Sequence, residues 1–169
     1  IFVDPGGFSA RGAEDRARAA AVVVGSTPSS EHILLDVYSE KDTFLACCRK
    51  VVEFCSAYAP RKLVVELAGQ QAAFIEVLRR ELDAAGVHVP IEPVKPGVKA
   101  KEVRILGLEP LFQRGQVFIG TGANFHEFKT QYTQFPRSAR FDVLDALSYL
   151  PQFVRRAPNK TMRSPADRH

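Results

Sequence analysis

The sequence predicts a single α/β domain with a mixed sheet, and three observations carry this prediction. The chain has 169 residues, which is the length of one ordinary domain, and its 46% hydrophobic and 25% charged residues are typical of globular proteins. Three short apolar segments joined by turn residues open the chain, as in an antiparallel meander. Helical and strand-like segments then alternate, which favours a sheet flanked by helices.

The three strands expected in the meander are residues 1–4, 19–25 and 33–38. Pro5 and the two glycines after it allow a sharp turn at the end of the first strand, and three consecutive valines favour β-structure in the second. Residues 8–18 are small, polar and charged, and are expected to form a loop.

Helical spacing begins after the meander. Apolar side chains recur at intervals of three, four and seven residues over 41–59, and Pro60 ends this helix. The continuous apolar run 63–67 is typical of a buried parallel strand. Residues 69–85 predict a second helix with Gly86 after its end, as in a helix C-cap.

The rest of the chain continues the alternation of strands and helices. The expected elements are a strand at 87–94, a helix at 98–114 that Pro110 breaks near its last turn, a short strand at 116–119, and helices at 124–133 and 141–155. Residues 156–169 are polar and contain proline, which predicts a basic, disordered tail after a domain of residues 1–155.

The formal net charge of +4 lies in the C-terminal part of the chain. Residues 155–169 contain five basic residues and one acid, so the remaining body of the protein is neutral. A basic tail suits a polyanionic partner, and it equally suits a solubilising or linker-like extension.

Composition argues against several classes of protein. No apolar run approaches the roughly 18 residues of a membrane helix, and no basic-then-apolar signal opens the chain. Cys47, Cys48 and Cys55 lack the spacing of a disulfide framework or a zinc site, and are expected to be buried thiols in a reducing cytosol. Because the chain starts at Ile1 rather than Met, we expect that it was excised from a longer protein.

Two of the expected strands carry an acid within a buried apolar segment. Asp4 is the fourth residue of the first strand, and Glu66 is the fourth residue of Leu-Val-Val-Glu-Leu. Such a carboxylate costs free energy unless it is paired or bound to a metal. If these strands are neighbours, a divalent cation between the two carboxylates would relieve their repulsion. The alternative is that each acid pairs with a nearby Lys or Arg.

The last expected helix adds two more acids. Asp142 and Asp145 are spaced i and i+3, so they lie on one face of that helix. Both are in its first turn, where negative charge is favourable in itself, so helix capping is an alternative role. Acids drawn from two strands and one helix are harder to explain by capping, and they favour a metal site.

Four segments together resemble the C-terminal nuclease domain of the terminase large subunit of tailed phages, the motor that packages viral DNA. In chain order they are Phe-Val-Asp-Pro-Gly at 2–6 with the loop acid Asp15 and the strand at 21–25, Leu-Val-Val-Glu-Leu at 63–67, Lys-Glu-Val-Arg-Ile at 101–105 running on to 111–117, and Asp-Val-Leu-Asp-Ala-Leu-Ser-Tyr at 142–149. The resemblance spans about residues 1–155.

The resemblance implies a ribonuclease H-like fold and cleavage of double-stranded DNA with two divalent ions, Mg²⁺ or Mn²⁺. It implies that Asp4 and Glu66 are the first two catalytic, metal-binding acids. The third comes from the closing helix, where many members have paired acids but this chain has Phe141 at the first position. Asp142 matches the second position and is expected as a direct ligand, and Asp145 as a second ligand or a group that orients one.

The implied mechanism is two-metal-ion hydrolysis, in which one ion activates a water for in-line attack and the other stabilises the departing 3′ oxygen. The expected DNA-binding residues are a basic cluster consisting of Lys95, Lys99, Lys101 and Arg104. Such residues would neutralise backbone phosphates without reading the base sequence. A solvated helix face is the alternative for this cluster.

The resemblance also implies partners and a location. Besides double-stranded DNA, the partners would be an ATPase domain of the same polypeptide, the small terminase subunit and the portal, in the host cell cytoplasm and without a membrane. The ATPase domain would precede Ile1, because this chain has no Gly-x-x-x-x-Gly-Lys-Ser/Thr loop.

Three other functions compete with this interpretation. One is a related ribonuclease H-like nuclease such as a Holliday-junction resolvase, and another is a non-catalytic DNA-binding module of the same fold. The third is an actin-like ATPase fragment, because Asp-Pro-Gly-Gly at 4–7 resembles a phosphate loop. The last interpretation needs a second phosphate loop and an adenosine pocket, and the sequence indicates neither.

Overall fold

The computed structural model describes residues 1–6, 18–67, 72–96, 100–137 and 140–153. Its strands form one six-stranded sheet in the order β5-β4-β1-β2-β3-β6. The strands are β1 Phe2–Asp4, β2 Ala19–Ser26, β3 His32–Glu40, β4 Leu63–Glu66, β5 Ile91–Val94 and β6 Val117–Ile119. β1, β2 and β3 pair antiparallel, whereas β4 is parallel to β1 and to β5, and β6 is parallel to β3. The predicted mixed sheet, an antiparallel meander extended by parallel strands, is confirmed.

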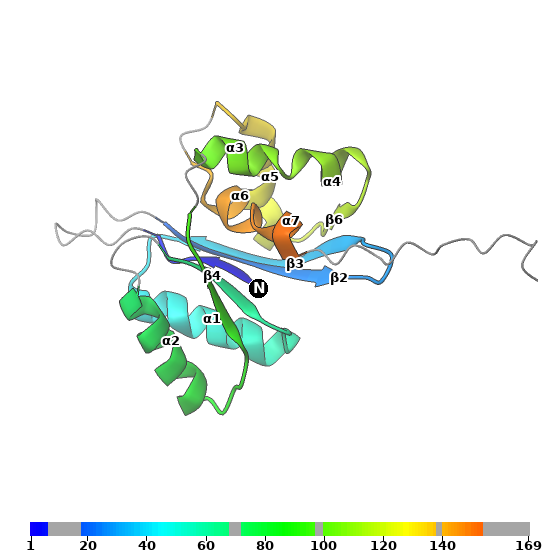
Figure 1. Ribbon diagram of the computed structural model, residues 1–169. Coiled ribbons are helices and arrows are strands. Elements are labelled where there is room, and N and C mark those ends of the chain that lie inside the picture. Colours follow the sequence, from blue (N-terminus) through cyan, green and yellow to red (C-terminus); the bar gives the residue numbers. More distant parts are fainter. Residues whose placement is uncertain (7–17, 68–71, 97–99, 138–139, 154–169) are drawn as a thin grey trace, which may run out of the picture.

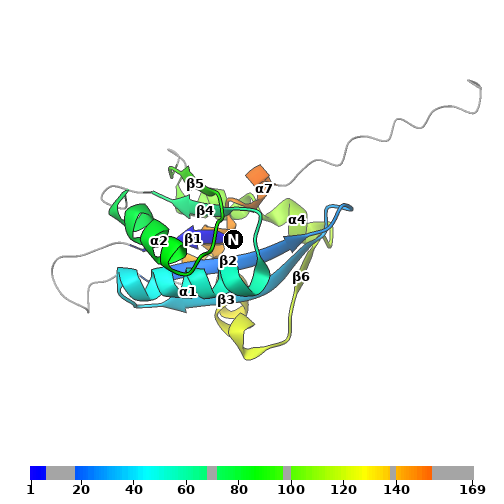
Figure 2. The same cartoon turned by 90° about the horizontal axis from the view of Figure 1, so that it is seen from below.

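Helices cover both faces of this sheet (Figure 1). On one face lie α1 Phe44–Tyr58 and α2 Ala72–Ala84, which pack side by side across the strands (Figure 2). The other face carries α3 Lys101–Leu106, α4 Glu109–Gln113, the 3₁₀ turn η3 Ala123–Phe125, α5 His126–Gln134, α6 Asp142–Leu147 and α7 Leu150–Phe153. The protein is therefore a three-layer sandwich with the sheet in the middle.

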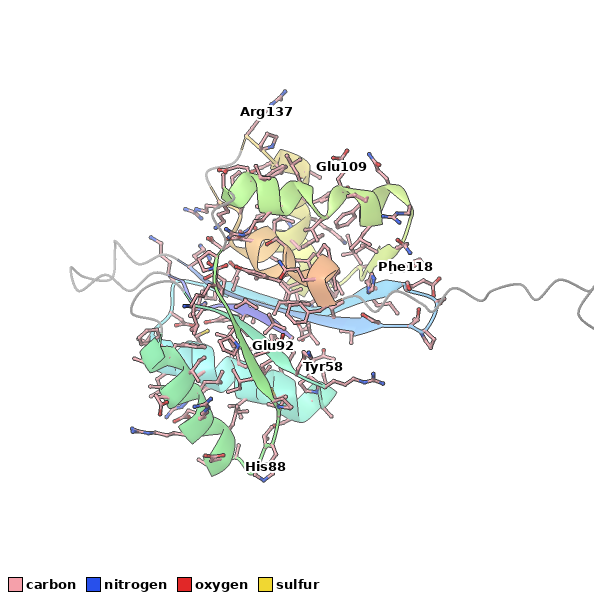
Figure 3. The ribbon with its side chains drawn as sticks, in the orientation of Figure 1. Tyr58, His88, Glu92, Glu109, Phe118 and Arg137 are labelled. Carbon is pink, nitrogen blue, oxygen red and sulfur yellow. The ribbon has the colours of Figure 1, made fainter. Side chains whose placement is uncertain are left out.

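Each helical layer has its own hydrophobic core. Side chains fill the space between sheet and helices on both sides, while Arg137 and His88 lie at opposite outer ends of the molecule (Figure 3). Val3 of β1 belongs to the core under α1 and α2, whereas its neighbour Phe2 belongs to the core under α3 to α7. Because strand side chains alternate between faces, Asp4 faces the same side as Phe2.

The first helix begins at Phe44, three residues after the expected start, and ends before Pro60 as expected. The Thr43 hydroxyl accepts a hydrogen bond from the Ala46 N–H at 3.2 Å, which caps the N-terminus of α1. At the other end, Ala59 adopts a left-handed conformation with φ of 42°, and its N–H bonds to the Cys55 carbonyl. Pro60 follows and cannot continue the helix.

Two expected long helices are each divided in the structure. The helix expected at 98–114 is α3 followed by α4, because the chain turns at Gly107 and Pro110 then occupies the first turn of α4. Proline suits that position, since it has no N–H to satisfy, so Pro110 starts a helix where it was expected to break one. The helix expected at 141–155 is α6 followed by α7, with Ser148 between them.

Several strand boundaries also differ from the expected ones. The strand expected at 87–94 is confined to Ile91–Val94, and the third strand continues to Glu40. The expectations for the loop 8–17 and for the tail 156–169 lie outside the described residues. In the described part of the chain, no helix combines the length and the hydropathy needed to cross a membrane.

Candidate active site

The sheet places Asp4 and Glu66 next to each other, at the carboxyl ends of the adjacent inner strands β1 and β4. β1 and β4 are parallel, with Phe2 opposite Val64 and Val3 opposite Val65, so the two acids occupy corresponding positions. Both are more than nine-tenths buried and face the layer of α3 to α7. The juxtaposition expected from sequence is therefore present.

A turn after β1 fixes the Asp4 carboxylate. The Gly6 N–H donates to Asp4 Oδ1 at 2.9 Å. Gly6 has a φ of 72°, a conformation that a residue with a Cβ rarely adopts, so the glycine lets the backbone curl back towards the acid. The Pro-Gly sequence predicted this turn.

The Glu66 carboxylate is held from the far end of the chain. The Tyr149 hydroxyl, which lies just after α6, donates to Glu66 Oε2 at 2.7 Å inside the protein. Arg104 Nη2 lies 3.5 Å from the same oxygen. The sequence patterns gave Tyr149 no role, and because α6 ends at Leu147, helical spacing from Asp145 does not place it.

Helix α6 places the two remaining acids beside these strands. Asp145 is almost enclosed, with 4% of its side chain exposed, whereas 18% of the Asp142 side chain is exposed. The start of α6 is capped by another helix, because Gln131 Oε1 of α5 accepts the N–H groups of Val143 and Leu144 at 3.0 and 3.3 Å. Helix starts need such acceptors, and no sequence pattern indicated that Gln131 provides one.

Helix α3 brings two cations into the acidic group. Arg104 Nη2 lies 2.6 Å from Asp145 Oδ1, and Lys101 Nζ lies 3.2 Å from Asp145 Oδ2 and 3.5 Å from Asp142 Oδ1. We call these six residues the acid cluster: Asp4, Glu66, Lys101, Arg104, Asp142 and Asp145. All four predicted acids are thus brought together, and two of the predicted DNA-binding residues lie among them.

The other two members of the predicted basic cluster are Lys95 and Lys99. Lys95 follows β5 and is exposed, and Lys99 lies outside the described residues, as does the loop acid Asp15. The alternative considered from the sequence was that the buried acids pair with nearby Lys or Arg residues. Lys101 and Arg104 make contacts of this kind. Their contact with phosphates stays a prediction.

Burial and mutual repulsion perturb the carboxylates. The pKa of Asp4 is raised to about 7, first because the group is removed from water and then because Glu66 is close; the Gly6 hydrogen bond opposes this shift. Burial also raises the pKa of Glu66, against the lowering effect of the Tyr149 hydrogen bond. A group of acids with raised pKa values is typical of a functional site.

The pKa values of the two cations are also raised, which favours their charged forms. Burial lowers the pKa of Lys101, but the carboxylates of Asp145 and Asp142 outweigh it, so the net shift is upward. Burial lowers the pKa of Arg104 as well, but Asp145, Tyr149 and Glu66 together outweigh it, so the net shift is again upward. Both side chains are therefore held as charged partners of the acids.

The donor chemistry of the cluster fits a divalent ion. Carboxylate oxygens are the ligands that Mg²⁺ and Mn²⁺ prefer, and Asp4, Glu66 and Asp142 would supply them. Among the described residues, no three His, Cys, Asp or Glu side chains are arranged as a ready metal-binding group in this conformation. Lys101 and Arg104 instead supply the positive charge that the acids need.

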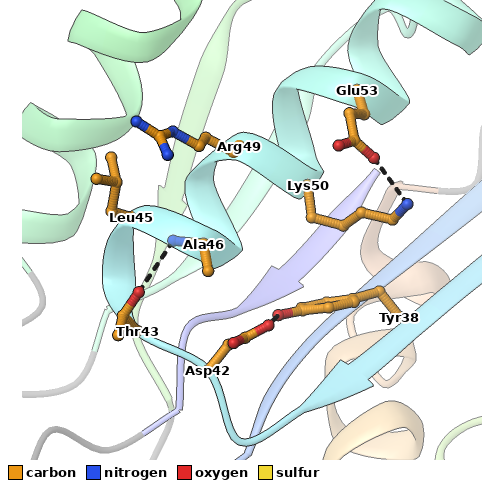
Figure 4. A pocket seen from close by; sticks show the side chains of 8 residues that line it. All are labelled: Tyr38, Asp42, Thr43, Leu45, Ala46, Arg49, Lys50 and Glu53. Atoms are coloured by element: carbon orange, nitrogen blue, oxygen red, sulfur yellow. Dashed lines mark hydrogen bonds and ion pairs between the residues drawn. The ribbon is translucent and has the colours of Figure 1, made fainter.

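A pocket of about 380 Å³ lies away from the cluster, at the start of α1 (Figure 4). Its charged side chains already have partners: Asp42 accepts a hydrogen bond from the Tyr38 hydroxyl at 2.6 Å, Lys50 pairs with Glu53 at 2.8 Å, and Arg49 pairs with Glu81 of α2 at 3.3 Å. None of the clustered acids lines it. The buried cluster, and not this open pocket, is the candidate active site.

Comparison with known proteins supports the fold. No family model and no curated protein matches the sequence. Among solved structures, fowlpox virus resolvase, in complex with its substrate Holliday junction DNA, is similar with a TM-score of 0.55 and 11% identity, over 90% of this chain and 96% of that chain. Thermus thermophilus RuvC gives a TM-score of 0.42 and 16% identity, over 88% of this chain and 90% of that chain. The chain has the ribonuclease H-like fold that the sequence resemblance implied.

Proposed function

We propose that this protein is a divalent-metal-dependent endonuclease that cuts DNA by hydrolysing its phosphodiester bonds. The observation that carries the proposal is the convergence of four acids, from the ends of β1 and β4 and from α6, within a buried edge of the sheet. Among the described residues, Asp4 has no ion pair and the other three acids share two cations. A purely structural network would be expected to balance its buried charges more evenly.

Different residues would bind the metal ions and orient the ligands in such a site. Bound Mg²⁺ or Mn²⁺ would supply a polarised phosphate and a nucleophilic water at neutral pH. Asp4, Glu66 and Asp142 would hold the ions, with Asp145 as a further ligand or as a group that orients one. The Gly6 N–H and the Tyr149 hydroxyl each fix one carboxylate oxygen, so the remaining oxygen of Asp4 and of Glu66 keeps a defined direction.

A plasmid cleavage assay tests the proposal. The purified protein should nick or linearise supercoiled DNA with Mn²⁺ or Mg²⁺, and excess EDTA should abolish the reaction. Asp4→Asn and Glu66→Gln should each lower the rate more than about 100-fold, because they remove metal ligands. Glu92→Gln is the matched control, since Glu92 is an acid of β5 that pairs with Lys62 at the surface. Cleavage that persists in EDTA or in both acid variants would overturn the metal mechanism.

We further propose that the natural substrate is double-stranded viral DNA in the form of concatemers, cut during genome packaging. Support comes from the order of the four terminase-like segments, which contribute Asp4, Glu66, Lys101 with Arg104, and the acids of α6. In this role the partners are an ATPase domain of the same polypeptide, the small terminase subunit and the portal, in the host cell cytoplasm.

A Holliday-junction resolvase is the second candidate, and one observation favours it. The match to fowlpox virus resolvase covers nearly the whole of both chains, so the likeness is not confined to a shared sheet. Cleavage of a four-way junction should be compared with cleavage of a linear duplex of the same sequence. A packaging nuclease should cut both at similar rates, whereas a resolvase should cut the junction selectively and symmetrically.

The path of the DNA is a separate proposal. Lys95 is exposed, whereas only 34% of the Lys101 side chain and 12% of the Arg104 side chain are exposed. Lys95→Gln combined with Lys99→Gln should weaken binding to all sequences alike. Each lost phosphate contact should also reduce the slope of log affinity against log salt by about 0.9. An unchanged salt slope would mean that DNA does not contact these two lysines.

A further inference from the structure

Arg104 holds an unusual position within the acid cluster. Its Nη2 atom lies 2.6 Å from Asp145 Oδ1 and 3.5 Å from Glu66 Oε2, so one nitrogen of the guanidinium bridges α6 and β4. The Tyr149 ring lies beside the same group, with its centroid 5.8 Å from Arg104 Cζ. The guanidinium is therefore enclosed by the residues that define the candidate site.

The bridged acids are the same groups that a metal ion would use. A buried carboxylate needs a positive charge nearby, and a guanidinium and a divalent ion are alternative ways of supplying it. Two divalent ions would already balance four carboxylates, so the charge of Arg104 would then be in excess next to Glu66 and Asp145. Arg104 and the metal would thus compete for these two acids.

Lys101 is less suited to this role. Its shortest distance to a carboxylate oxygen is 3.2 Å, and about a third of its side chain is exposed. Its flexible side chain can move into water at small cost, whereas the enclosed guanidinium of Arg104 cannot leave Asp145 without losing a short, charge-assisted hydrogen bond.

We propose that Arg104 is an internal counter-ion that occupies the metal-free site by bridging Glu66 and Asp145, and that it must release this bridge when divalent ions bind. The inference rests on the proposed function, because it assumes that the acids bind metal. It adds that this one side chain lowers the affinity of the site for metal while stabilising the metal-free fold.

The test compares Mn²⁺ binding and thermal unfolding for the wild type and Arg104→Gln. Glutamine keeps much of the length and polarity of the side chain and removes its charge. Calorimetric titration should show Mn²⁺ binding at least about tenfold tighter in the variant, the scale of effects seen for groups that contact metal ligands. In EDTA the variant should melt at a lower temperature than the wild type, and Mn²⁺ should raise its melting temperature by more.

Arg49→Gln is the matched control. Arg49 also pairs with a carboxylate through a guanidinium nitrogen, Nε at 3.3 Å from Glu81, but on the surface of α1 and away from the cluster. It should leave Mn²⁺ affinity unchanged. If Arg104 only supports the fold, Arg104→Gln will lower stability in EDTA while Mn²⁺ affinity stays equal or weakens, and the inference is then wrong.

The outcomes also separate this inference from the proposed function. A wild type that binds Mn²⁺ and cuts DNA, with no gain of affinity in Arg104→Gln, overturns the counter-ion role alone. Absence of Mn²⁺ binding in both proteins, together with absence of metal-dependent cleavage, overturns both.

Discussion

The two helical layers of the sheet bury different kinds of side chains. The core between the sheet and α1 with α2 is made of apolar residues and three cysteines. The layer of α3 to α7 also has a large apolar core, but at its edge it buries Asp145, Gln131 and much of Arg104. The same sheet is thus a scaffold on one face and a candidate active site on the other.

The buried cysteines in the layer of α1 and α2 are chemically unreactive. Burial raises the pKa of Cys48 to about 12 and that of Cys55 to about 11, so both thiols stay protonated at neutral pH. In the second layer burial raises the pKa of Asp4 to about 7, which is within the physiological range. The difference teaches that the same physical cause has opposite consequences for the two groups: burial moves a thiol, whose ordinary pKa is 9.0, further from neutral pH, whereas it moves a carboxyl, whose ordinary pKa is 3.8, towards neutral pH.

The largest expected effect on stability is in the layer of α1 and α2, which we call the scaffold layer. Phe74 of α2 is completely buried, so Phe74→Ala should lower the free energy of unfolding by about 3–5 kcal/mol. Urea denaturation measures this loss. Metal-dependent cleavage per folded molecule should be unchanged, and a parallel loss of activity in the folded protein would show that the layers are not separate in function.

The next effect is in the layer of α3 to α7, where we expect a large loss of activity and a small loss of stability. Tyr149→Phe removes only the hydroxyl that holds Glu66, so it should reduce cleavage about 10- to 100-fold while stability changes by about 1 kcal/mol. Weaker Mn²⁺ binding should accompany the loss, which a purely structural role would not produce. Tyr132→Phe is the control, because Tyr132 is an exposed tyrosine of α5. Equal activity of both variants would exclude a positioning role for Tyr149.

The last effect involves no lost contact and is a change in how stability depends on pH. The pKa of Asp4 is raised from 3.8 to about 7 in the folded protein, so between these values the folded state holds a proton that the unfolded chain has released. Stability in EDTA should therefore fall as pH rises towards 7, by up to about 1.4 kcal/mol per pH unit. Asp4→Asn cannot lose that proton, so it should flatten the slope and be more stable than the wild type above pH 7.

Unfolding curves in EDTA between about pH 5 and pH 8 check this prediction. Asp83→Asn is a suitable control, because Asp83 is an exposed acid of α2 in the scaffold layer. If Asp4→Asn is instead less stable at every pH, Asp4 belongs to a structural network and its raised pKa has no part in the pH dependence.

The sequence predicted the acids of the site better than their partners. Asp4 and Glu66 stand out because a charged residue inside a short apolar strand is conspicuous, and parallel pairing of β1 with β4 then makes them neighbours. Asp142 and Asp145 share a helical face by their spacing alone. Each of these signals is local, or needs only one assumption about which strands are adjacent.

The partners could not be predicted because they depend on packing between distant helices. Arg104 of α3 reaches Asp145 of α6 over 41 positions of the chain, and Gln131 caps α6 from α5. The periodicity that identifies an amphipathic helix gives no information about which carboxylate a long side chain will meet. For the same reason, basic residues expected to face DNA are found among the acids.

A crystal structure of the wild-type protein grown or soaked in Mn²⁺ tests the central claim most directly. We predict anomalous density for Mn²⁺ between the carboxylates of Asp4, Glu66 and Asp142, with the Arg104 guanidinium withdrawn from Asp145. Crystals in high Mn²⁺ that show no metal at these acids, and Arg104 still bridging Glu66 and Asp145, would contradict the assignment of the acid cluster as a metal-dependent active site.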